Sequence, residues 1–490
     1  MSQAAPRSDY PDHIDAAVLK VAGVVVLGAV MSILDITVVN VALPTFQHVF
    51  ADAGDPPLKY SLVAWTVTGY TLALATVIPL SGWAADRFGT KRLYMTAIAL
   101  FTLGSALCAT AWSINSLIAF RVLQGFGGGM LMPIGMTIMT RAAGPHRMGR
   151  LMAILGVPML LGPIGGPILG GWLIDTASWH WIFLINVPLG LIALTYAFVV
   201  LAKDSPEPSE SFDFLGMALM SPGLASFLYG VSSIPGEGTF NAPKVYLPMV
   251  LGVVLMGTFV FHSFRPEHPL LDLRLFRNRN LTFAIITMFM FASAFFGGLL
   301  LVPTYFQQIR LETPLQAGLL VAPQGIGAMC TMPIAGALAD RIPIGRIAPV
   351  GLVVILIGMF GFTQITDTTP YAVLIAFLVV MGFGMGATMM PLFTSALKTL
   401  SAHEVARGST LLNITQQIAS SVGVATMSVI LTNHLKGATS APAAADAFAR
   451  TYWVAWALVG LTLVPAYFLP RKHEESHLLD EESVPPVIVP

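Results

Sequence analysis

The sequence has 490 residues, of which 55% are hydrophobic and only 10% are charged, and its 25 Lys and Arg balance 25 Asp and Glu. Because soluble domains carry about 25% charged residues, this composition excludes an ordinary soluble enzyme. The even charge balance gives no reason to expect a nucleic-acid or other polyanionic partner, and no phosphate-binding P-loop motif occurs.

The hydrophobic residues gather in blocks of about 20, the length of helix that crosses a bilayer. These blocks lack the alternation that is typical of membrane β-strands. They predict an all-α integral membrane protein with fourteen transmembrane helices, at approximately residues 18–44, 60–84, 93–113, 116–140, 150–174, 181–201, 213–234, 246–264, 281–306, 316–339, 347–366, 370–397, 409–433 and 450–469.

The distribution of basic residues predicts the orientation of these helices. Fourteen spans put both termini on one side of the membrane, and most Lys and Arg then fall in segments on that side. By the positive-inside rule this side is the cytoplasm. The polar residues 1–17 therefore form a cytoplasmic tail, and the charged, Pro-rich residues 471–490 form a second, disordered one.

An internal repeat predicts how the chain is divided. The sequence PLSGWAADRFGTKR at 79–92 returns as PIAGALADRIPIGR at 333–346, and both lie at the end of a predicted span. A second echo pairs Gly128, Met132 and Pro133 with Gly386, Met390 and Pro391. The offset of eight spans predicts two six-helix halves, 18–201 and 281–470, with two inserted helices and linkers at 202–280. Parallel repeats of this kind place a substrate site between the halves, near the midplane.

Asp35 and Arg121 are the clearest charged residues inside predicted spans. A charge at that depth costs at least ~2.5 kcal/mol unless it is paired or faces water. Counted from the outer ends of their spans, both lie ~9 to 13 Å deep at ~1.5 Å per residue, which allows them to pair. A motion that alternately pairs and isolates Asp35 would load and release a proton; the alternative is a fixed structural ion pair.

The repeated segments predict a gate at the cytoplasmic face. Glycines and charged residues in a tight loop can form contacts between the halves that break and re-form, whereas the simpler alternative is that basic loops only orient the spans. The predicted gate residues are Gly82, Asp86, Arg87, Gly89, Arg92, Asp340 and Arg341.

The fifth span combines glycines and prolines, which favours close helix packing and bends. Its central residues are Gly162, Pro163, Gly165 and Gly166. Polar and methionine side chains in other spans are candidates for a substrate cavity, although methionine also faces lipid and polar groups also join helices. The cavity candidates are Asn40, Tyr70, Gln124, Met132, Gln324, Met390, Asn413 and Gln417.

Four segments together resemble the signature motifs of the fourteen-helix drug:proton antiporter family of the major facilitator superfamily. They are LDITVVNVALP at 34–44, GWAADRFGTKR at 82–92, RVLQG at 121–125 and GPIGG at 162–166. The resemblance implies export across a bacterial cytoplasmic membrane by alternating access. It also implies that Asp35 is the proton-linked acid, Arg121 its span-4 partner, and 162–166 the antiporter-specific motif.

Two positions depart from the family pattern. His180 lies between Trp179 and Trp181 where the family usually has Arg, and Pro343 stands where the first repeat has Gly89. The flanking tryptophans favour an interfacial anchor for His180 over a proton sensor. The outer mouth and the second inner gate are therefore expected to differ from those of the family.

The sequence thus predicts a proton-coupled exporter of lipophilic neutral or monocationic compounds, lipid-like ones among them. Members of the family that export dications tend to have additional acids in their spans, and the predicted spans here have none beyond Asp35, so the resemblance implies that dications are disfavoured. The expected energy source is a proton gradient, without a cofactor or metal. Two alternatives stay open: a lipid or metabolite exporter of the same fold, and a membrane scaffold or sensor that transports nothing. An enzyme is not expected, since the spans contain no catalytic or metal-ligand cluster.

Overall fold

The computed structural model describes residues 15–51, 56–58, 60–143, 147–204, 211–237, 239–398, 400 and 404–471. Over these residues the chain is built from helices, without a strand. Apart from 15–17 and Arg471, the two predicted tails lie outside this range.

The helices follow the predicted blocks closely. The first part of the chain contains α1 (Ala16–Val49), α2 (Tyr60–Val63), α3 (Trp65–Phe88), α4 (Thr90–Ala109), α5 (Ile114–Ala143), α6 (Met148–Thr176), α7 (Trp181–Leu184), α8 (Asn186–Val200), α9 (Phe214–Glu237) and α10 (Pro243–Ser263). The second part contains η1 (Leu273–Arg277), α11 (Arg279–Gln308), α12 (Pro314–Arg341), α13 (Ile344–Phe362), α14 (Tyr371–Lys398), α15 (Val405–Leu435) and α16 (Ala441–Tyr467).

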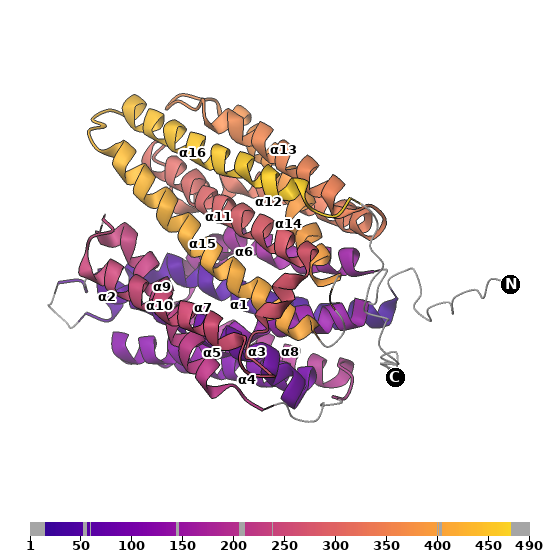
Figure 1. Cartoon of the computed structure of the whole chain (residues 1–490). Coiled ribbons are helices and arrows are strands. Elements are labelled where there is room, and N and C mark those ends of the chain that lie inside the picture. Colours follow the sequence, from indigo (N-terminus) through magenta and orange to yellow (C-terminus); the bar gives the residue numbers. More distant parts are fainter. Residues whose placement is uncertain are drawn as a thin grey trace.

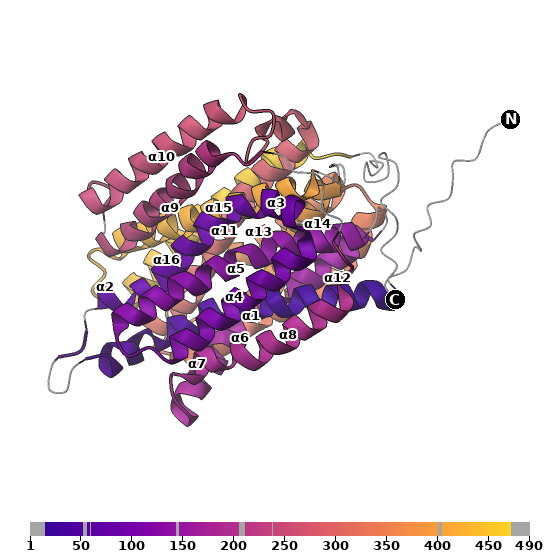
Figure 2. The same ribbon diagram turned by 90° about the horizontal axis from the view of Figure 1, so that it is seen from below.

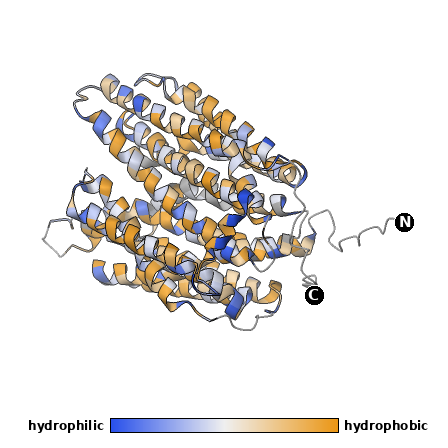
Figure 3. Cartoon of the chain, viewed as in Figure 1, coloured by the Kyte–Doolittle hydropathy of each residue, from blue (hydrophilic) through white to orange (hydrophobic). Residues whose placement is uncertain are grey.

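Thirteen helices within the described ranges are long and hydrophobic enough to cross a membrane, with Trp181–Val200 counted as one. Helix α6, 29 residues long, covers the fifth predicted span, 150–174. Hydrophobic residues cover most of the helix lengths, and hydrophilic residues gather mainly towards the helix ends (Figure 3). The predicted all-α membrane fold is confirmed.

Two groups of helices pack side by side (Figure 1). In the first, α3 and α4 pack on α5, and α1 packs on α6; in the second, α12 and α13 pack on α14, and α11 packs on α15. We call these groups the N-half (α1–α8) and the C-half (α11–α16). The inserted helix α9 contacts both α3 and α15, and α10 lies outside it at the edge of the bundle (Figure 2).

Two helices depart from the predicted spans at prolines. The first predicted span ends at Pro44, but α1 continues to Val49, because Phe46 is fully buried against Trp179 and Phe183. The sixth predicted span is broken at Ile185, between α7 and α8. The ring of Pro188 clashes with a helical carbonyl four residues earlier, at Leu184, which explains this break.

The halves meet at one end of the bundle. We call this end the base; it is where α1 begins and α16 ends (Figure 1), and the opposite end is the mouth. Hydrogen bonds between the halves join Ser81 to Thr410 (3.0 Å) and Thr137 to Ser409 (2.9 Å), all four buried and closer to the base. The described arrangement is therefore closed at the base.

Candidate functional site

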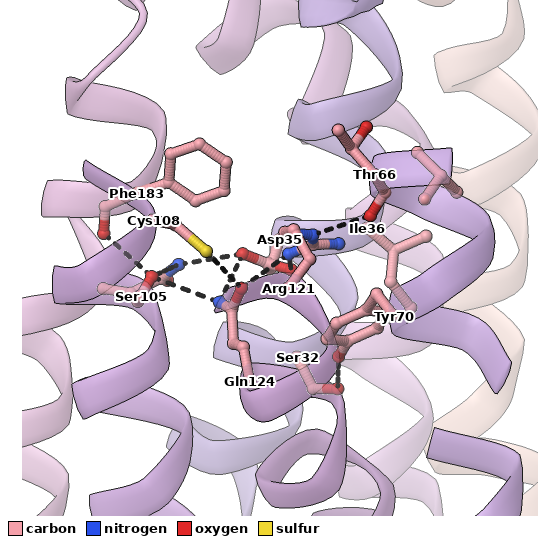
Figure 4. Close-up of polar contacts among 12 residues, drawn as sticks. Ser32, Asp35, Ile36, Thr66, Tyr70, Ser105, Cys108, Arg121, Gln124 and Phe183 are labelled. Carbon is pink, nitrogen blue, oxygen red and sulfur yellow. Dashed lines mark hydrogen bonds and ion pairs between the residues drawn. The ribbon is translucent and has the colours of Figure 1, made fainter. Parts of the chain in front are cut away.

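Asp35 and Arg121 form an ion pair inside the N-half (Figure 4). Asp35 lies in α1 and Arg121 in α5, and both side chains are fully buried. The guanidinium Nη1 donates to Asp35 Oδ2. Since two unpaired charges at this depth would be very costly, the pair satisfies both.

Amide groups complete the coordination of the Asp35 carboxylate (Figure 4). Gln124 Nε2 donates to Oδ1 at 2.8 Å, and Gln124 Oε1 accepts from Arg121 Nη1 at 2.7 Å. Asn186 Nδ2 also donates to Oδ1, at 3.2 Å, and to the Ser105 hydroxyl at 3.1 Å. Side chains of α5 and α8 thus hold the carboxylate of α1, and Ser105 of α4 accepts hydrogen bonds from both amides. Asn186 and Ser105 were not among the sequence candidates.

Arg121 is held on its other side by α3. Its Nε donates to the Thr66 carbonyl at 3.0 Å, and its Cζ lies 4.1 Å from the centroid of the Tyr70 ring, a cation–π contact. Its Nη2 is buried and has no hydrogen-bond partner among the described residues. Among the described contacts of Arg121, Asp35 is the one carboxylate. The charge of Asp35 therefore decides whether the positive charge of Arg121 is neutralised.

A cavity of about 350 Å³ lies between the halves at mid-depth, on the mouth side of the base contacts. In α1 the residues that line it are Ser32, Ile33, Ile36 and Thr37. Asp35 is not among them, because it points towards α4, α5 and α8. Helix α1 thus separates the charged pair from the cavity and contacts both.

The cavity wall is apolar with a few amides. Its apolar part includes Met132, Phe295, Phe296, Met385 and Met389, and its amides are Gln324, Asn413, Gln416 and Gln417. Among the described residues, its lining contains no ionisable side chain. A wall of this composition suits an apolar molecule that is fixed by few hydrogen bonds.

The sequence candidates for the cavity divide into two groups. Met132, Gln324, Asn413 and Gln417 line it. The other four lie elsewhere: Tyr70 and Gln124 are in the buried network, Met390 packs near Gly156, and Asn40 is exposed and donates to the Ile36 carbonyl. These four are not among the residues that line the cavity, and a role for them in substrate binding stays a prediction.

The glycine face of α6 packs against α1. A Cβ at Gly162 would lie 2.1 Å from Ile33 Cγ2, and one at Gly166 would lie 2.1 Å from Thr37 Oγ1. At Gly165 the nearest atom, of Leu34, is 3.6 Å away. The side chain of Pro163 lies outside the described residues. Ile33 and Thr37 line the cavity, so this packing sets the position of the cavity wall and of Asp35 together.

We expect Gly166→Ala to lower the melting temperature of the purified protein by several degrees, because overpacking costs about 1–3 kcal/mol. Gly171→Ala is the matched control on the same helix, since a Cβ there meets nothing within 4 Å. Differential scanning fluorimetry in detergent checks both. Equal melting temperatures for the two variants would contradict the close α1–α6 contact.

The predicted gate residues lie at the base, and two of them join the halves. Asp340 Oδ1 accepts from the backbone N–H of Gly149 at 2.7 Å, and its Oδ2 accepts from Arg150 Nε at 3.2 Å. A Cβ at Gly82 would lie 3.1 Å from Thr410 Oγ1 and 3.3 Å from the Ala406 carbonyl. The α3–α15 and α6–α12 contacts therefore close the base.

Other gate residues bind within the N-half. Asp86 pairs with Arg141 at 3.3 Å. Gly89 has a φ of 87°, and the backbone N–H groups of Lys91 and Arg92 each donate to the Asp204 carboxylate at 2.9 Å. Asp204, which the sequence candidates missed, thus fixes the loop between α3 and α4. Arg87, Arg92 and Arg341 have exposed side chains.

His180 lies at the mouth, where its ring stacks on Trp179 with centroids 3.9 Å apart. Its Nδ1 is 3.3 Å from the Ser178 hydroxyl. The position of His180 agrees with the predicted role as an interfacial anchor. These two contacts of its ring include no acidic side chain. Within the described part of the chain, no group of three metal-ligand residues occurs.

Comparisons with known proteins agree with this architecture. The family model of the Major Facilitator Superfamily matches residues 25–424. Among solved structures, the human organic anion transporter MFSD10 superposes with a TM-score of 0.63 at 18% identity, covering 90% of this chain and 99% of the other. The proton:xylose symporter XylE superposes with a TM-score of 0.62 at 14% identity, covering 93% and 96%. At such identities these structures show a shared fold.

Curated relatives are more similar in sequence. The Multidrug resistance protein B homolog of Mycobacterium tuberculosis (strain ATCC 25618 / H37Rv) is 48% identical, over 96% of this chain and 94% of the relative. The Putative multidrug resistance protein MdtD of Yersinia pestis (strain Pestoides F) is 33% identical, over 88% and 91%. The resemblance found in the motifs is confirmed: the chain is a multi-pass membrane transporter that belongs to the Major Facilitator Superfamily.

Proposed function

We propose that this transporter exports lipophilic neutral or monocationic molecules from the bacterial cytoplasm in exchange for protons, as a multidrug efflux protein. The observation that carries the proposal is the buried Asp35–Arg121 pair directly behind an apolar cavity without ionisable groups. The names of its curated relatives support the multidrug part.

The cavity supports the proposed substrate class. Its volume of about 350 Å³ lies within the range of about 300–1,000 Å³ that drug-sized ligands occupy. Methionine side chains are flexible and polarisable, and they adapt to ligands of different shape. Because the lining holds no carboxylate to balance a second positive charge, dications are disfavoured.

The buried pair supports proton coupling. When Asp35 takes up a proton, its negative charge disappears while Arg121 stays charged. Breaking a buried ion pair in this way costs about 3–5 kcal/mol. Such a cost favours a different arrangement of α1, in which Arg121 meets water or another partner. Since α1 also lines the cavity and packs on α6, protonation of Asp35 and exchange of the substrate are linked through one helix.

The closed base fits one state of an alternating-access cycle. We assign the base to the cytoplasm, because the basic loops predict cytoplasmic termini. The described arrangement then corresponds to a transporter that is closed to the cytoplasm, in the cytoplasmic membrane. Opening to the cytoplasm requires the contacts of Gly82 and Asp340 to separate.

Proteoliposomes with purified protein and trapped DNA test the proposal. We expect ethidium, a lipophilic monocation, to accumulate faster and to a higher level when the lumen is more acidic than the outside. Propidium, which shares its ring system but carries two charges, should enter about tenfold more slowly, as expected for an uncompensated charge in a site of low polarity. Equal uptake of both dyes would overturn the substrate class, and ethidium uptake at the same rate and to the same level with and without the pH gradient would overturn the antiport.

A further inference from the structure

One amide oxygen at the cavity wall is fully buried and has no hydrogen-bond partner among the described residues. Gln324, in α12, lines the cavity and is only 4% exposed. Its Nε2 donates to the Met385 sulfur at 3.2 Å, whereas its Oε1 is buried and has no hydrogen-bond partner within the described residues. Buried polar atoms are nearly always paired, so an orphaned acceptor at a cavity wall points to a ligand.

Four other polar residues of the cavity have hydrogen-bond partners within the protein. Asn413 donates to the Ser409 carbonyl at 2.8 Å, and the Thr37 hydroxyl donates to the Leu34 carbonyl at 3.0 Å. The Ser420 hydroxyl donates to the Gln417 carbonyl at 3.1 Å, and Ser32 is 3.2 Å from the Tyr70 hydroxyl. Gln324 therefore differs from these residues in offering a desolvated acceptor.

We propose that Gln324 Oε1 accepts a hydrogen bond from an N–H or O–H group of the transported molecule, so that among aromatic compounds the cavity favours those that carry such a donor. The inference rests on the proposed transport through this cavity. Phe295, Phe296 and Met385 supply the apolar surface for the aromatic body. A site that hydrogen-bonds a substrate donor discriminates strongly against the analogue that lacks it, because the acceptor is then left unpaired.

Acridone and 10-methylacridone test this selection. Both are uncharged, planar and fluorescent, and they differ by a methyl group in place of the N–H hydrogen. Titration of each into the purified full-length protein should give a Kd for acridone that is about tenfold lower, as expected for loss of one hydrogen bond to a buried acceptor. In the Gln324→Met variant the two compounds should bind equally.

Two controls separate a binding role from a structural one. Gln324→Met should melt at the same or a higher temperature than wild type without ligand, because it replaces an unsatisfied buried polar group by an apolar one. Gln364→Leu, an exchange at an exposed glutamine outside the cavity lining, should keep the tenfold preference. A marked loss of stability in Gln324→Met would mean that the side chain is structural.

The remaining outcomes overturn the inference in distinguishable ways. If wild type binds both compounds equally and still transports ethidium, the role of Gln324 is wrong while the proposed function stands. If neither compound binds, the proposed selection for a hydrogen-bond donor is wrong. If neither compound binds and ethidium is not transported, the proposed function fails as well.

Discussion

Asp35→Asn is expected to abolish gradient-driven ethidium accumulation, lowering its initial rate by about tenfold or more, because an amide cannot take up and release the proton that couples the two fluxes. Binding of the dye should persist, since Asp35 does not line the cavity. Uptake by proteoliposomes and dye binding in detergent measure the two effects separately.

Two variants control for damage to the fold. Asp35→Asn leaves Arg121 buried without its counter-charge, which destabilises the protein; combining it with Arg121→Gln removes both charges and should restore the melting temperature but not coupled transport. Asp446→Asn disrupts an exposed pair with Arg450 and should transport normally, because exposed pairs contribute little. Normal coupled transport by Asp35→Asn would identify the pair as a fixed structural element.

Asp340→Asn is expected to shift the transporter towards the state that is open at the base. The carboxylate of Asp340 accepts hydrogen bonds from Gly149 and Arg150 across the halves, and a hydrogen bond to a charged group contributes about 1.5–3 kcal/mol. If the variant loses about 1.4 kcal/mol of this stabilisation, the population of the state that is open at the base should rise about tenfold.

Labelling of a cysteine at the closed contact measures this opening. Ser409 is fully buried between the halves, so a Ser409→Cys variant reacts with a maleimide only when the base opens. Cys330, which is exposed, is replaced by Ser in this background. We expect Asp340→Asn to raise the labelling rate about tenfold, in line with the larger population of the open state. Asp446→Asn should leave the labelling rate unchanged. Equal labelling rates in all three proteins would show that Asp340 does not hold the base closed.

The sequence predicted the membrane helices well because each hydrophobic block is about as long as the bilayer is thick. It also predicted that Asp35 and Arg121 lie at similar depth, and the structure pairs them. The depth was counted from Pro44, however, while α1 extends to Val49. Prolines are tolerated inside membrane helices because neighbouring helices pack around them, and here the burial of Phe46 favours continuation of α1 beyond Pro44.

The detailed composition of the site was harder to predict, because hydropathy reports depth but not which way a side chain faces. Tyr70 and Gln124 lie at the level of the cavity but point into the buried network. Asn186 and Asp35 are 151 positions apart in the sequence, and the packing of α8 on α1 brings their side chains together. The sequence feature that could have identified Asn186 is its place as a single amide in the otherwise apolar segment 181–188.

The exchange of substrate for protons can be measured directly. Proteoliposomes are loaded with ethidium and a trapped pH indicator, at equal pH on both sides, and then diluted into dye-free buffer. The account predicts that the lumen acidifies as ethidium leaves, and that Asp35→Asn with Arg121→Gln abolishes this acidification. Exit of ethidium through the wild-type protein without any change in lumenal pH would contradict proton antiport.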